Sequence, residues 1–255
     1  MDYTKLMDFT GKVVFVSGSS RGIGEALVRA FAANGARVIV SSRDQAACDA
    51  VAESIRADGG DAKAKAAHAG KMEDVAAVFD WIKEEYGQLD VLVNCGGTNP
   101  FYGPIADTPE AAFDKTIDVN LKGPFYLSSE AVKMMKEAGK GAIVNVASIN
   151  GITPGHLQGI YSMTKSAMIN MTKAFAREYG HDGIRVNAIC PGLVETKMTE
   201  VFTSNDEMLQ KFTNQFPIPR AGQPHDMVGG VLYLASDAAA FTTGTTLVMD
   251  GGVTA

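Results

Sequence analysis

Short runs rich in β-branched residues alternate along the whole chain with longer segments of mixed polarity. This alternation predicts a parallel sheet with helices on both faces, because each parallel strand needs a crossover connection to the next one. The α/β class with a doubly wound, seven-stranded parallel sheet follows from it. The seven runs with the length and composition of strands are residues 13–16, 37–40, 62–67, 89–93, 142–146, 185–189 and 245–249.

Two of these runs and one irregular segment indicate how the chain is organised. Residues 89–93 and 142–146 are almost entirely apolar, so we expect them at the centre of the sheet. No internal repeat or flexible linker divides the sequence, and residues 1–255 are therefore expected to form a single domain. Residues 194–220 break the alternation with two prolines and two short helical patterns, and we expect a substrate lid there.

Composition excludes several kinds of partner. The net charge is -6 and no basic run occurs, which argues against a nucleic-acid surface. No apolar stretch approaches the roughly 20 residues of a membrane span, and residues 1–10 lack the layout of a signal peptide. We therefore expect a cytoplasmic protein, with no membrane association, that acts on a small molecule.

Cysteine and acidic residues give no sign of a disulfide framework or a metal site. Cys48, Cys95 and Cys190 are an odd number and lie far apart, without paired CxxC spacing. The aspartates and glutamates show no clustered ligand spacing. The sequence predicts three reduced thiols and no bound metal.

A glycine-rich turn follows the first predicted strand. Residues 17–24 read Ser-Gly-Ser-Ser-Arg-Gly-Ile-Gly, and a helical pattern continues over residues 25–33. Glycine lets backbone amides approach a pyrophosphate, and the N-terminus of a helix stabilises its negative charge. The spacing is GxxxGxG and not the general GxGxxG, so this motif alone does not decide between a dinucleotide site and a turn without a ligand.

The end of the second predicted strand bears on which dinucleotide binds. It reads Ser41-Ser42-Arg43, and a hydroxyl and a guanidinium favour the 2′-phosphate of NADP, with Arg21 as a second cation. Asp44 could instead hold the 2′-hydroxyl of NAD if the strand ran two residues further. NADP is the prediction and NAD the alternative.

Candidate catalytic residues gather at one expected edge of the sheet. Tyr161 and Lys165 are four residues apart in the helical pattern of residues 160–178, so both side chains lie on one face. A neighbouring ammonium can lower the tyrosine pKa from about 10 and allow proton transfer. A YxxxK pair is common by chance, so it needs support.

Polar or turn residues follow three predicted strands: Ser148, Asn94 with Gly96 and Gly97, and Pro191 with Gly192.

In their order, these residues resemble the short-chain dehydrogenases/reductases, in the branch with a single-domain Rossmann fold. The resemblance covers residues 12–252. It rests on residues 18–24, Asn94-Cys95-Gly96-Gly97, Asn120-Leu121, Ser148, Tyr161 to Lys165, Pro191-Gly192 and Asp250-Gly251-Gly252.

The resemblance implies a role for each of four catalytic residues. Tyr161 would donate or accept the proton, and Lys165 would lower its pKa and hold the ribose hydroxyls. Ser148 would orient the substrate carbonyl, and Asn120 would hold a water molecule in a proton relay. The expected cofactor contacts are Gly18, Ser20, Arg21, Gly22, Ile23, Gly24, Ser42, Arg43, His68, Asn94, Gly96, Tyr161, Lys165, Pro191, Gly192, Val194 and Thr196.

Some positions depart from the family pattern. Cys95 and Gly96 replace its second Asn and its Ala, and His68 replaces an Asp that accepts a bond from the adenine amino group. A neutral histidine could accept the same bond. The stretch around His68, together with Ser41-Ser42-Arg43, resembles the NADP-using carbonyl reductase branch.

The expected activity is therefore the NADP-dependent interconversion of a ketone or aldehyde with its alcohol. The resemblance further implies a homotetramer. Two enzymatic alternatives on the same fold are a 3-oxoacyl-thioester reductase and an NAD-linked alcohol dehydrogenase. A catalytically silent dinucleotide-binding regulator is the alternative from another class. Phe101, Tyr102, His156 and residues 194–220 are expected to shape the substrate pocket.

Overall fold

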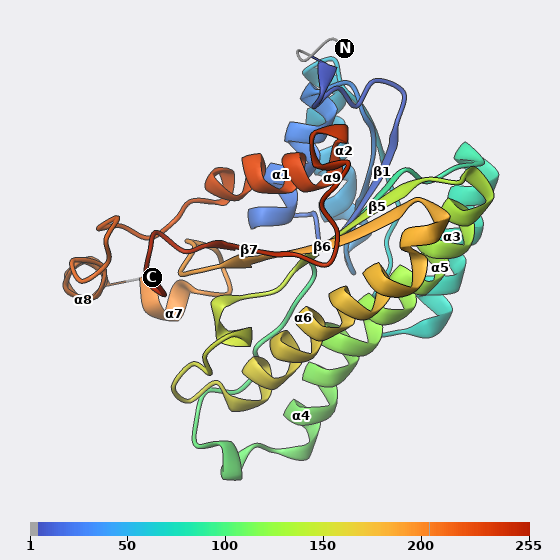
Figure 1. Ribbon diagram of the computed structural model, residues 1–255. Helices are drawn as coiled ribbons and strands as arrows, with labels where there is room; N and C mark the ends of the chain where they lie inside the picture. Colours follow the sequence, from blue (N-terminus) through green and yellow to red (C-terminus); the bar gives the residue numbers. More distant parts are fainter. Residues whose placement is uncertain (1–4, 204) are drawn as a thin grey trace.

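The computed structural model describes residues 5–203 and 205–255, in which the strands form one all-parallel sheet (Figure 1). The strand order is β3-β2-β1-β4-β5-β6-β7, so the direction of winding reverses between β1 and β4. The predicted fold class and the number of strands are confirmed. The strands are β1 (Val13–Ser17), β2 (Arg37–Ser41), β3 (Asp61–Ala64), β4 (Val91–Asn94), β5 (Gly141–Val146), β6 (Ile184–Pro191) and β7 (Thr246–Met249).

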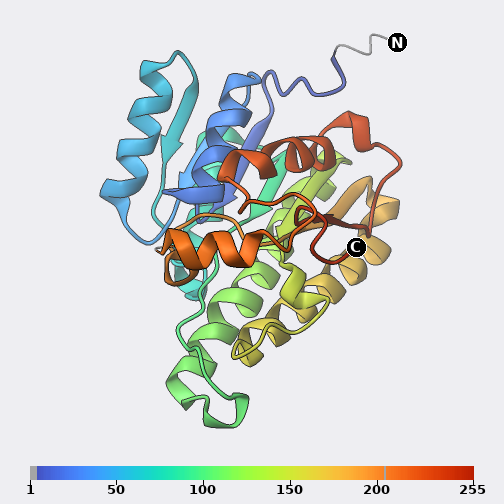
Figure 2. The same cartoon turned by 90° about the vertical axis from the view of Figure 1, so that its left-hand side faces the viewer.

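Helices cover both faces of this sheet. On one face lie α1 (Gly22–Ala33), α2 (Gln45–Ala57) and α9 (Val228–Ala235), and on the other lie α3 (Met72–Tyr86), α5 (Gly123–Ala138) and α6 (Gly159–Tyr179). Helix α4 (Glu110–Ile117) extends below α5 in Figure 1. Figure 2 shows the remaining short helices, α7 (Glu200–Thr203) and α8 (Asp206–Thr213), outside both layers, on the side of the molecule turned toward the viewer.

Alternate side chains of each central strand supply the two halves of the core. In β1, Val14 and Val16 belong to the cluster with α1, whereas Val13 and Phe15 belong to the cluster with α3. Phe15 meets Phe79 of α3 edge to face, with ring centroids 5.9 Å apart. Strands β4 and β5 lie in the middle of the order and are almost fully buried, as their apolar runs predicted.

Element ends differ from the predictions where a pairing partner or a side chain decides them. Strand β3 ends at Ala64 and not at residue 67, although the Lys65 and Ala67 amides still donate to the Val40 and Ser42 carbonyls. Strand β6 continues to Pro191, since it pairs with β7 as far as Met249. Helix α1 begins at Gly22, three residues earlier than predicted, so the last glycines of the turn form its first turn.

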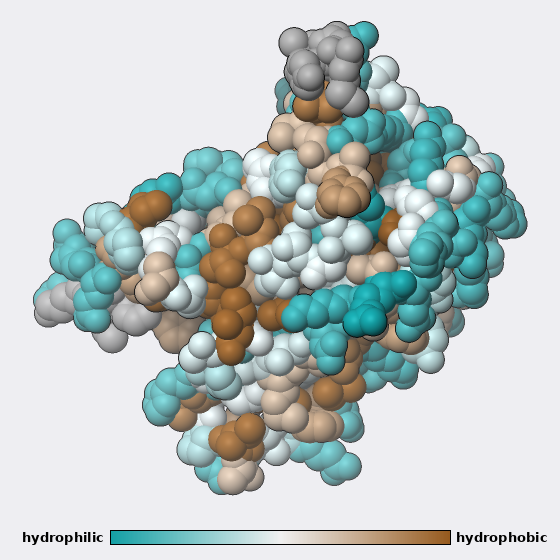
Figure 3. Space-filling view, in the orientation of Figure 1, coloured by the Kyte–Doolittle hydropathy of each residue, from teal (hydrophilic) through white to brown (hydrophobic). Residues whose placement is uncertain are grey.

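The two edge strands differ in chemistry. Strand β3 exposes Asp61 and Lys63, charges that disfavour pairing with another sheet. Strand β7 is apolar and partly exposed, and a brown apolar band crosses this region in Figure 3. Its Val248 is 39% exposed. Within residues 5–203 and 205–255, none of the helices has the length and apolar character needed to span a membrane.

Candidate active site

A cleft of about 790 Å³ opens at the carboxyl ends of the strands, where the winding reverses. Its wall runs from the glycine turn after β1, past the ends of β2 and β4, to Ser148 after β5 and the start of α6. It brings together most of the predicted site. The predicted residues that line it are Gly18, Ser20, Arg21, Gly22, Ile23, Gly24, Ser42, Arg43, His68, Gly96, Ser148, Tyr161, Lys165, Pro191, Gly192, Val194 and Thr196.

Close backbone contact explains why the turn after β1 needs glycine. Gly18 has φ +74°, and a Cβ atom there would lie 2.5 Å from the Gly96 Cα. The Ser19 hydroxyl donates to the Val16 carbonyl at 2.7 Å and accepts from the Ser41 amide at 2.9 Å. The turn is thereby fixed against β2 and the loop after β4, with its backbone open to the cleft.

Two of the predicted residues lie behind the cleft wall and not on it. The fully buried Asn94 amide donates to Ser128 Oγ at 3.0 Å and to Asn145 Oδ1 at 2.8 Å. Asn120 sits in a π-helical turn, Asp118–Lys122, and its amide accepts from the Thr98 N–H and donates to the Thr98 carbonyl, both at 2.8 Å. Both side chains therefore hold neighbouring segments of the fold in place.

The catalytic candidates meet at the floor of the cleft. Tyr161 lies in the first turn of α6, and a hydrogen bond joins its phenol to Ser148. Lys165 lies one turn later, with its Nζ 5.6 Å from the Tyr161 ring centroid. The same Nζ donates to the Val146 carbonyl at 2.7 Å. An acid/base phenol, a hydroxyl and an ammonium are therefore brought to one place.

Burial dominates the electrostatics of this group. It raises the pKa of Tyr161 to about 12, and the hydrogen bond with Ser148 opposes that rise. Burial also lowers the pKa of Lys165 to about 8. The structure thus differs from the expected lowering of the Tyr161 pKa by Lys165, because desolvation of the phenol is the larger effect while the ammonium bonds to Val146.

The far end of the cleft carries the residues that bear on the choice of dinucleotide. Ser42 and Arg43 follow directly after β2, and Arg21 is the N-cap residue of α1. Arg43 is exposed and makes no ion pair within the part of the chain that the structure describes. Asp44 is the N-cap of α2 and accepts from the Ala47 amide at 3.2 Å. Its carboxylate is therefore already used to begin a helix.

The His68 ring differs from its expected role as an acceptor. Its Nδ1 accepts a hydrogen bond from the Gly70 amide at 3.0 Å. A neutral imidazole has one donor and one acceptor nitrogen, so the remaining Nε2 carries the proton. His68 can donate a bond to an adenine ring nitrogen, but in this orientation it cannot accept one from the amino group.

Residues 194–220 leave and rejoin the fold at one point. A bridge pairs Val194 with Gly222, Glu195 N donates to the Gly222 carbonyl at 2.9 Å, and Gly222 N donates to the Leu193 carbonyl at 2.9 Å. The two short helical patterns predicted here appear as α7 and α8. Ser204, which the predicted lid includes, and residues 1–4 of the predicted domain lie outside the described residues.

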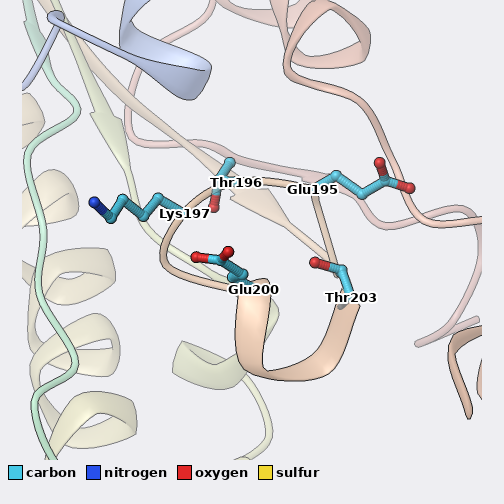
Figure 4. Close-up of a pocket in the computed structure, with 5 residues that line it drawn as sticks. All are labelled: Glu195, Thr196, Lys197, Glu200 and Thr203. Carbon is cyan, nitrogen blue, oxygen red and sulfur yellow. The ribbon is translucent and has the colours of Figure 1, made fainter. Parts of the chain in front are cut away.

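The first turn of this segment borders the cleft. Thr196 and Lys197 line both the cleft and a shallow hollow on its outer side (Figure 4). In that view the Lys197 side chain extends away from Glu195 and Thr203. Its ammonium therefore lies well apart from the Glu195 carboxylate.

Several lining residues were not predicted from the sequence. Lys115 had a usable signal, because it lies one helical turn before Val119 and both line the cleft. The others lie in irregular loops, where no periodicity marks a face. They include Thr98 and Asn99, whereas Lys197 and Met198 belong to the predicted lid, residues 194–220. Within residues 5–203 and 205–255, no group of His, Cys, Asp or Glu side chains could hold a metal ion.

Comparison with known proteins identifies the family. Residues 18–254 match a family model described as enoyl-(acyl carrier protein) reductase. An uncharacterized oxidoreductase of Thermotoga maritima is 39% identical over 253 residues, which are 98% of this chain and 100% of that protein. The chain belongs to the short-chain dehydrogenase/reductase (SDR) family. The resemblance inferred from the motifs is confirmed.

Further SDR relatives indicate the reaction class. The L-rhamnose 1-dehydrogenase (NAD(P)(+)) of Azotobacter vinelandii is 37% identical over 247 residues, 95% of this chain and 96% of that protein. The crystal structure of a gluconate 5-dehydrogenase from Burkholderia cenocepacia in complex with NADP and tartrate has a TM-score of 0.94 and 27% identity, covering 98% of both chains. This SDR is an oxidoreductase of alcohol and carbonyl groups whose fold binds a nicotinamide dinucleotide.

Proposed function

We propose that this SDR transfers hydride between NADP(H) and a ketone or aldehyde, or the corresponding alcohol, with Tyr161 as the general acid/base. One observation carries the proposal. Tyr161, Ser148 and Lys165 form one end of a cleft whose other end contains the glycine turn, Ser42 and Arg43. A dinucleotide lying along that cleft would bring its nicotinamide to the catalytic group.

The residues present fit such a cofactor. A Cβ atom at Gly18 would collide with Gly96, so the bare backbone of the turn is available to a pyrophosphate. Exposed Arg43 and Arg21 supply charge for a 2′-phosphate, while Asp44 is engaged as a helix cap. These features favour NADP over NAD. The cofactor, when bound, supplies or accepts the hydride.

The protein side of the reaction concerns one proton. Because burial holds the pKa of Tyr161 near 12, the phenol keeps its proton at neutral pH and can donate it to the substrate oxygen during reduction. Ser148 is hydrogen-bonded to the phenol and can orient the same oxygen. Lys165 stabilises the resulting phenolate with its charge, and two of its three N–H groups remain for ribose hydroxyls after the bond to Val146.

Residues 194–220 are proposed to cover the substrate. Support comes from their position, since residues 194 and 196–199 line the cleft beside Tyr161 and both ends of the segment are held at the bridge between Val194 and Gly222. The Asn120 amide already bonds to the backbone of Thr98 through its oxygen and its nitrogen. We propose that the second lone pair of the oxygen holds a water molecule, and that Asn120 acts in proton relay only through this water.

A homotetramer is proposed as the working assembly. The apolar, partly exposed edge strand β7 could pair with a second copy, and α5 exposes Phe125 and Tyr126 for another contact. Light scattering should then give about four times the chain mass of 26.9 kDa. A mass of one chain at micromolar concentration would contradict the assembly.

The direct test is a panel of ketones, aldehydes, acyl thioesters and alcohols, each assayed with both nicotinamide pairs by absorbance change. We expect reduction of simple carbonyl compounds with NADPH at a higher kcat/KM than with NADH. Preference for 3-oxoacyl thioesters would favour the alternative reductase. Turnover of no compound despite dinucleotide binding would indicate a regulator.

A further inference from the structure

Three amide side chains form a polar wall beside the catalytic serine. The wall consists of Asn99 from the loop after β4 and of Asn150 and Gln158 from the loop between β5 and α6. The Gln158 Oε1 accepts from the Asn99 Nδ2 at 3.1 Å and from the Asn150 Nδ2 at 3.3 Å. The Asn150 backbone amide in turn donates to the Ser148 Oγ at 3.1 Å. The amide wall is thus linked directly to the candidate catalytic group.

The orientation of these amides leaves one acceptor unused. Since Gln158 takes both Nδ2 groups, the Asn99 Oδ1 is turned away from it, and this buried oxygen has no hydrogen-bond partner among the described residues. A buried acceptor without a partner is unfavourable, because it has lost its hydrogen bonds to water. Asn99 also lines the cleft. A ligand that brings a hydrogen-bond donor would satisfy this oxygen, whereas a methyl group or a carboxylate would not.

The backbone under the amide wall is held rigidly. Gly103 of the first loop pairs with Gln158 of the second, and the Gly103 amide donates to the Leu157 carbonyl at 3.0 Å. Leu157 has φ +59°, a left-handed conformation that is unfavourable for a non-glycine residue. Such strain persists only where surrounding contacts impose it. The bridge therefore presets the position of Gln158.

Aromatic and thioether side chains gather near the amide wall, and the Tyr102 hydroxyl is hydrogen-bonded to Asn99. The Tyr102 ring meets Phe202 of α7 edge to face, with centroids 5.5 Å apart. The Met198 Cε lies 3.8 Å from the position of a Cβ built on Gly97, and the Lys165 Nζ lies 3.7 Å from the same position. Methionine 198 therefore reaches across the cleft toward the catalytic lysine. Hydrogen-bonding amides and an apolar side, formed by Met198 and the two aromatic rings, therefore occur together in this region.

We propose that the substrate is an uncharged polyhydroxylated carbonyl compound, of the sugar or polyol class. Its hydroxyl groups bond to the amide wall, and its C–H face packs under Tyr102, Met198 and Phe202. Hydroxyl donors satisfy the Asn99 oxygen, and the apolar side matches the C–H face that a sugar ring or chain presents. This inference rests on the proposed function and names its substrate class.

The test compares two ketones with the same four-carbon skeleton, erythrulose and butan-2-one, as NADPH-dependent substrates. A site built to bond a hydroxyl discriminates strongly against the analogue without it. We expect kcat/KM for erythrulose to exceed that for butan-2-one by at least 100-fold. In Gln158→Leu the ratio should fall at least tenfold, because both asparagine amides lose the acceptor that orients them.

Two further variants separate a specific effect from damage to the fold. Gln158→Glu keeps an acceptor for both asparagines, and its ratio should lie within about threefold of the ratio for the unaltered protein. Gln88→Leu removes an exposed amide in the loop before β4, at the amino ends of the strands and away from the cleft. This variant should leave the ratio of the two kcat/KM values unchanged. Thermal melting and the Kd for NADPH are measured for each variant, so that the ratio is read only on folded, cofactor-binding protein.

The outcomes distinguish this inference from the proposed function. An unchanged ratio in folded Gln158→Leu, or a preference of the unaltered protein for butan-2-one, would overturn the substrate class and leave the reductase proposal standing. Reduction of neither ketone, nor of any carbonyl compound in the wider panel, would overturn both. A ratio that falls in Gln158→Leu and is kept in Gln158→Glu supports the inference.

Discussion

The Lys165 Nζ donates its 2.7 Å hydrogen bond to the Val146 carbonyl oxygen at the end of β5, and not to the phenol of Tyr161. Lysine 165 is only 3% exposed, and this carbonyl is the one protein acceptor that the described residues offer its ammonium. The bond fixes the ammonium at the floor of the cleft. A charged group is thus kept in a buried place, at a cost that the rest of the fold must offset.

Replacing Lys165 by methionine should stabilise the protein while abolishing activity. A pKa lowered from 10.5 to about 8 corresponds to a cost of about 3 kcal/mol at pH 7. Loss of the hydrogen bond to Val146 destabilises the variant by about 1–2 kcal/mol and offsets part of that gain. The free energy of unfolding in urea should therefore be about 1–2 kcal/mol higher for the variant. The exposed Lys173 of the same helix offers the control Lys173→Met, which should leave stability unchanged.

The gain from Lys165→Met should also depend on pH. Between about pH 8 and 10.5 the folded protein holds fewer protons on Lys165 than the unfolded chain does. The stability of the unaltered protein relative to the variant therefore rises with pH across this window. Unfolding at pH 7 and pH 10.5 should show that the variant loses its advantage at the higher pH, and a variant less stable at pH 7 would contradict the assigned cost of burial.

Tyr161→Phe should remove hydride transfer and leave cofactor binding nearly intact. The substitution deletes only the hydroxyl that exchanges the proton, and a positioned acid of this kind contributes about 10²–10⁴-fold to rate. We expect kcat to fall at least 100-fold while the Kd for NADPH, from fluorescence titration, stays within threefold. Tyr126→Phe, on the exposed face of α5, is the matched control. Full activity in Tyr161→Phe would disprove the assigned role.

Arg43→Ala should weaken NADPH binding far more than NADH binding. A charge-assisted bond to a phosphate is worth about 1.5–3 kcal/mol, or roughly 10–100-fold in affinity, and only NADPH carries the 2′-phosphate. Titration of both cofactors measures the difference. Arg177→Ala, an exposed arginine near the end of α6, should affect neither. Equal losses for both cofactors in Arg43→Ala would remove the argument for NADP.

Gly18→Ala should lower cofactor affinity by at least tenfold and destabilise the fold. Its Cβ would lie 2.5 Å from the Gly96 Cα and 2.6 Å from the Gly96 N, so the backbone of the turn must move. Gly59 has a similar φ of +87° with nothing within 4 Å of its Cβ position. Gly59→Ala therefore measures the conformational cost alone, about 1–2 kcal/mol. Equal destabilisation by the two variants would mean that the contact with Gly96 is unimportant.

The sheet could be predicted because its strands are buried on both faces. Runs such as residues 142–146 carry apolar side chains at every position except Asn145, and polar side chains otherwise gather at the ends of the strands. That restriction also located Ser148 and the turn after β6. The strand ends themselves depended on neighbours, as where β6 continues to Pro191 because it pairs with β7.

Contacts between distant loops could not be predicted. The bond from Asn99 to Gln158 joins residues 59 positions apart, in two loops without periodicity. The tautomer of His68 depends on the Gly70 amide, and the part played by Asn120 depends on a π-helical turn. None of these leaves a pattern in the sequence, because each is decided by the placement of a backbone group and not by residue type.

The bridge between Val194 and Gly222 makes the intervening stretch exchangeable. Because the two ends of this segment are paired with each other, a replacement segment of different length would leave the register between β6 and β7 unchanged. Members of the SDR family can thus differ in the substrate they accept while sharing the same sheet and cleft. The same junction offers protein engineers a natural place at which to graft a new specificity.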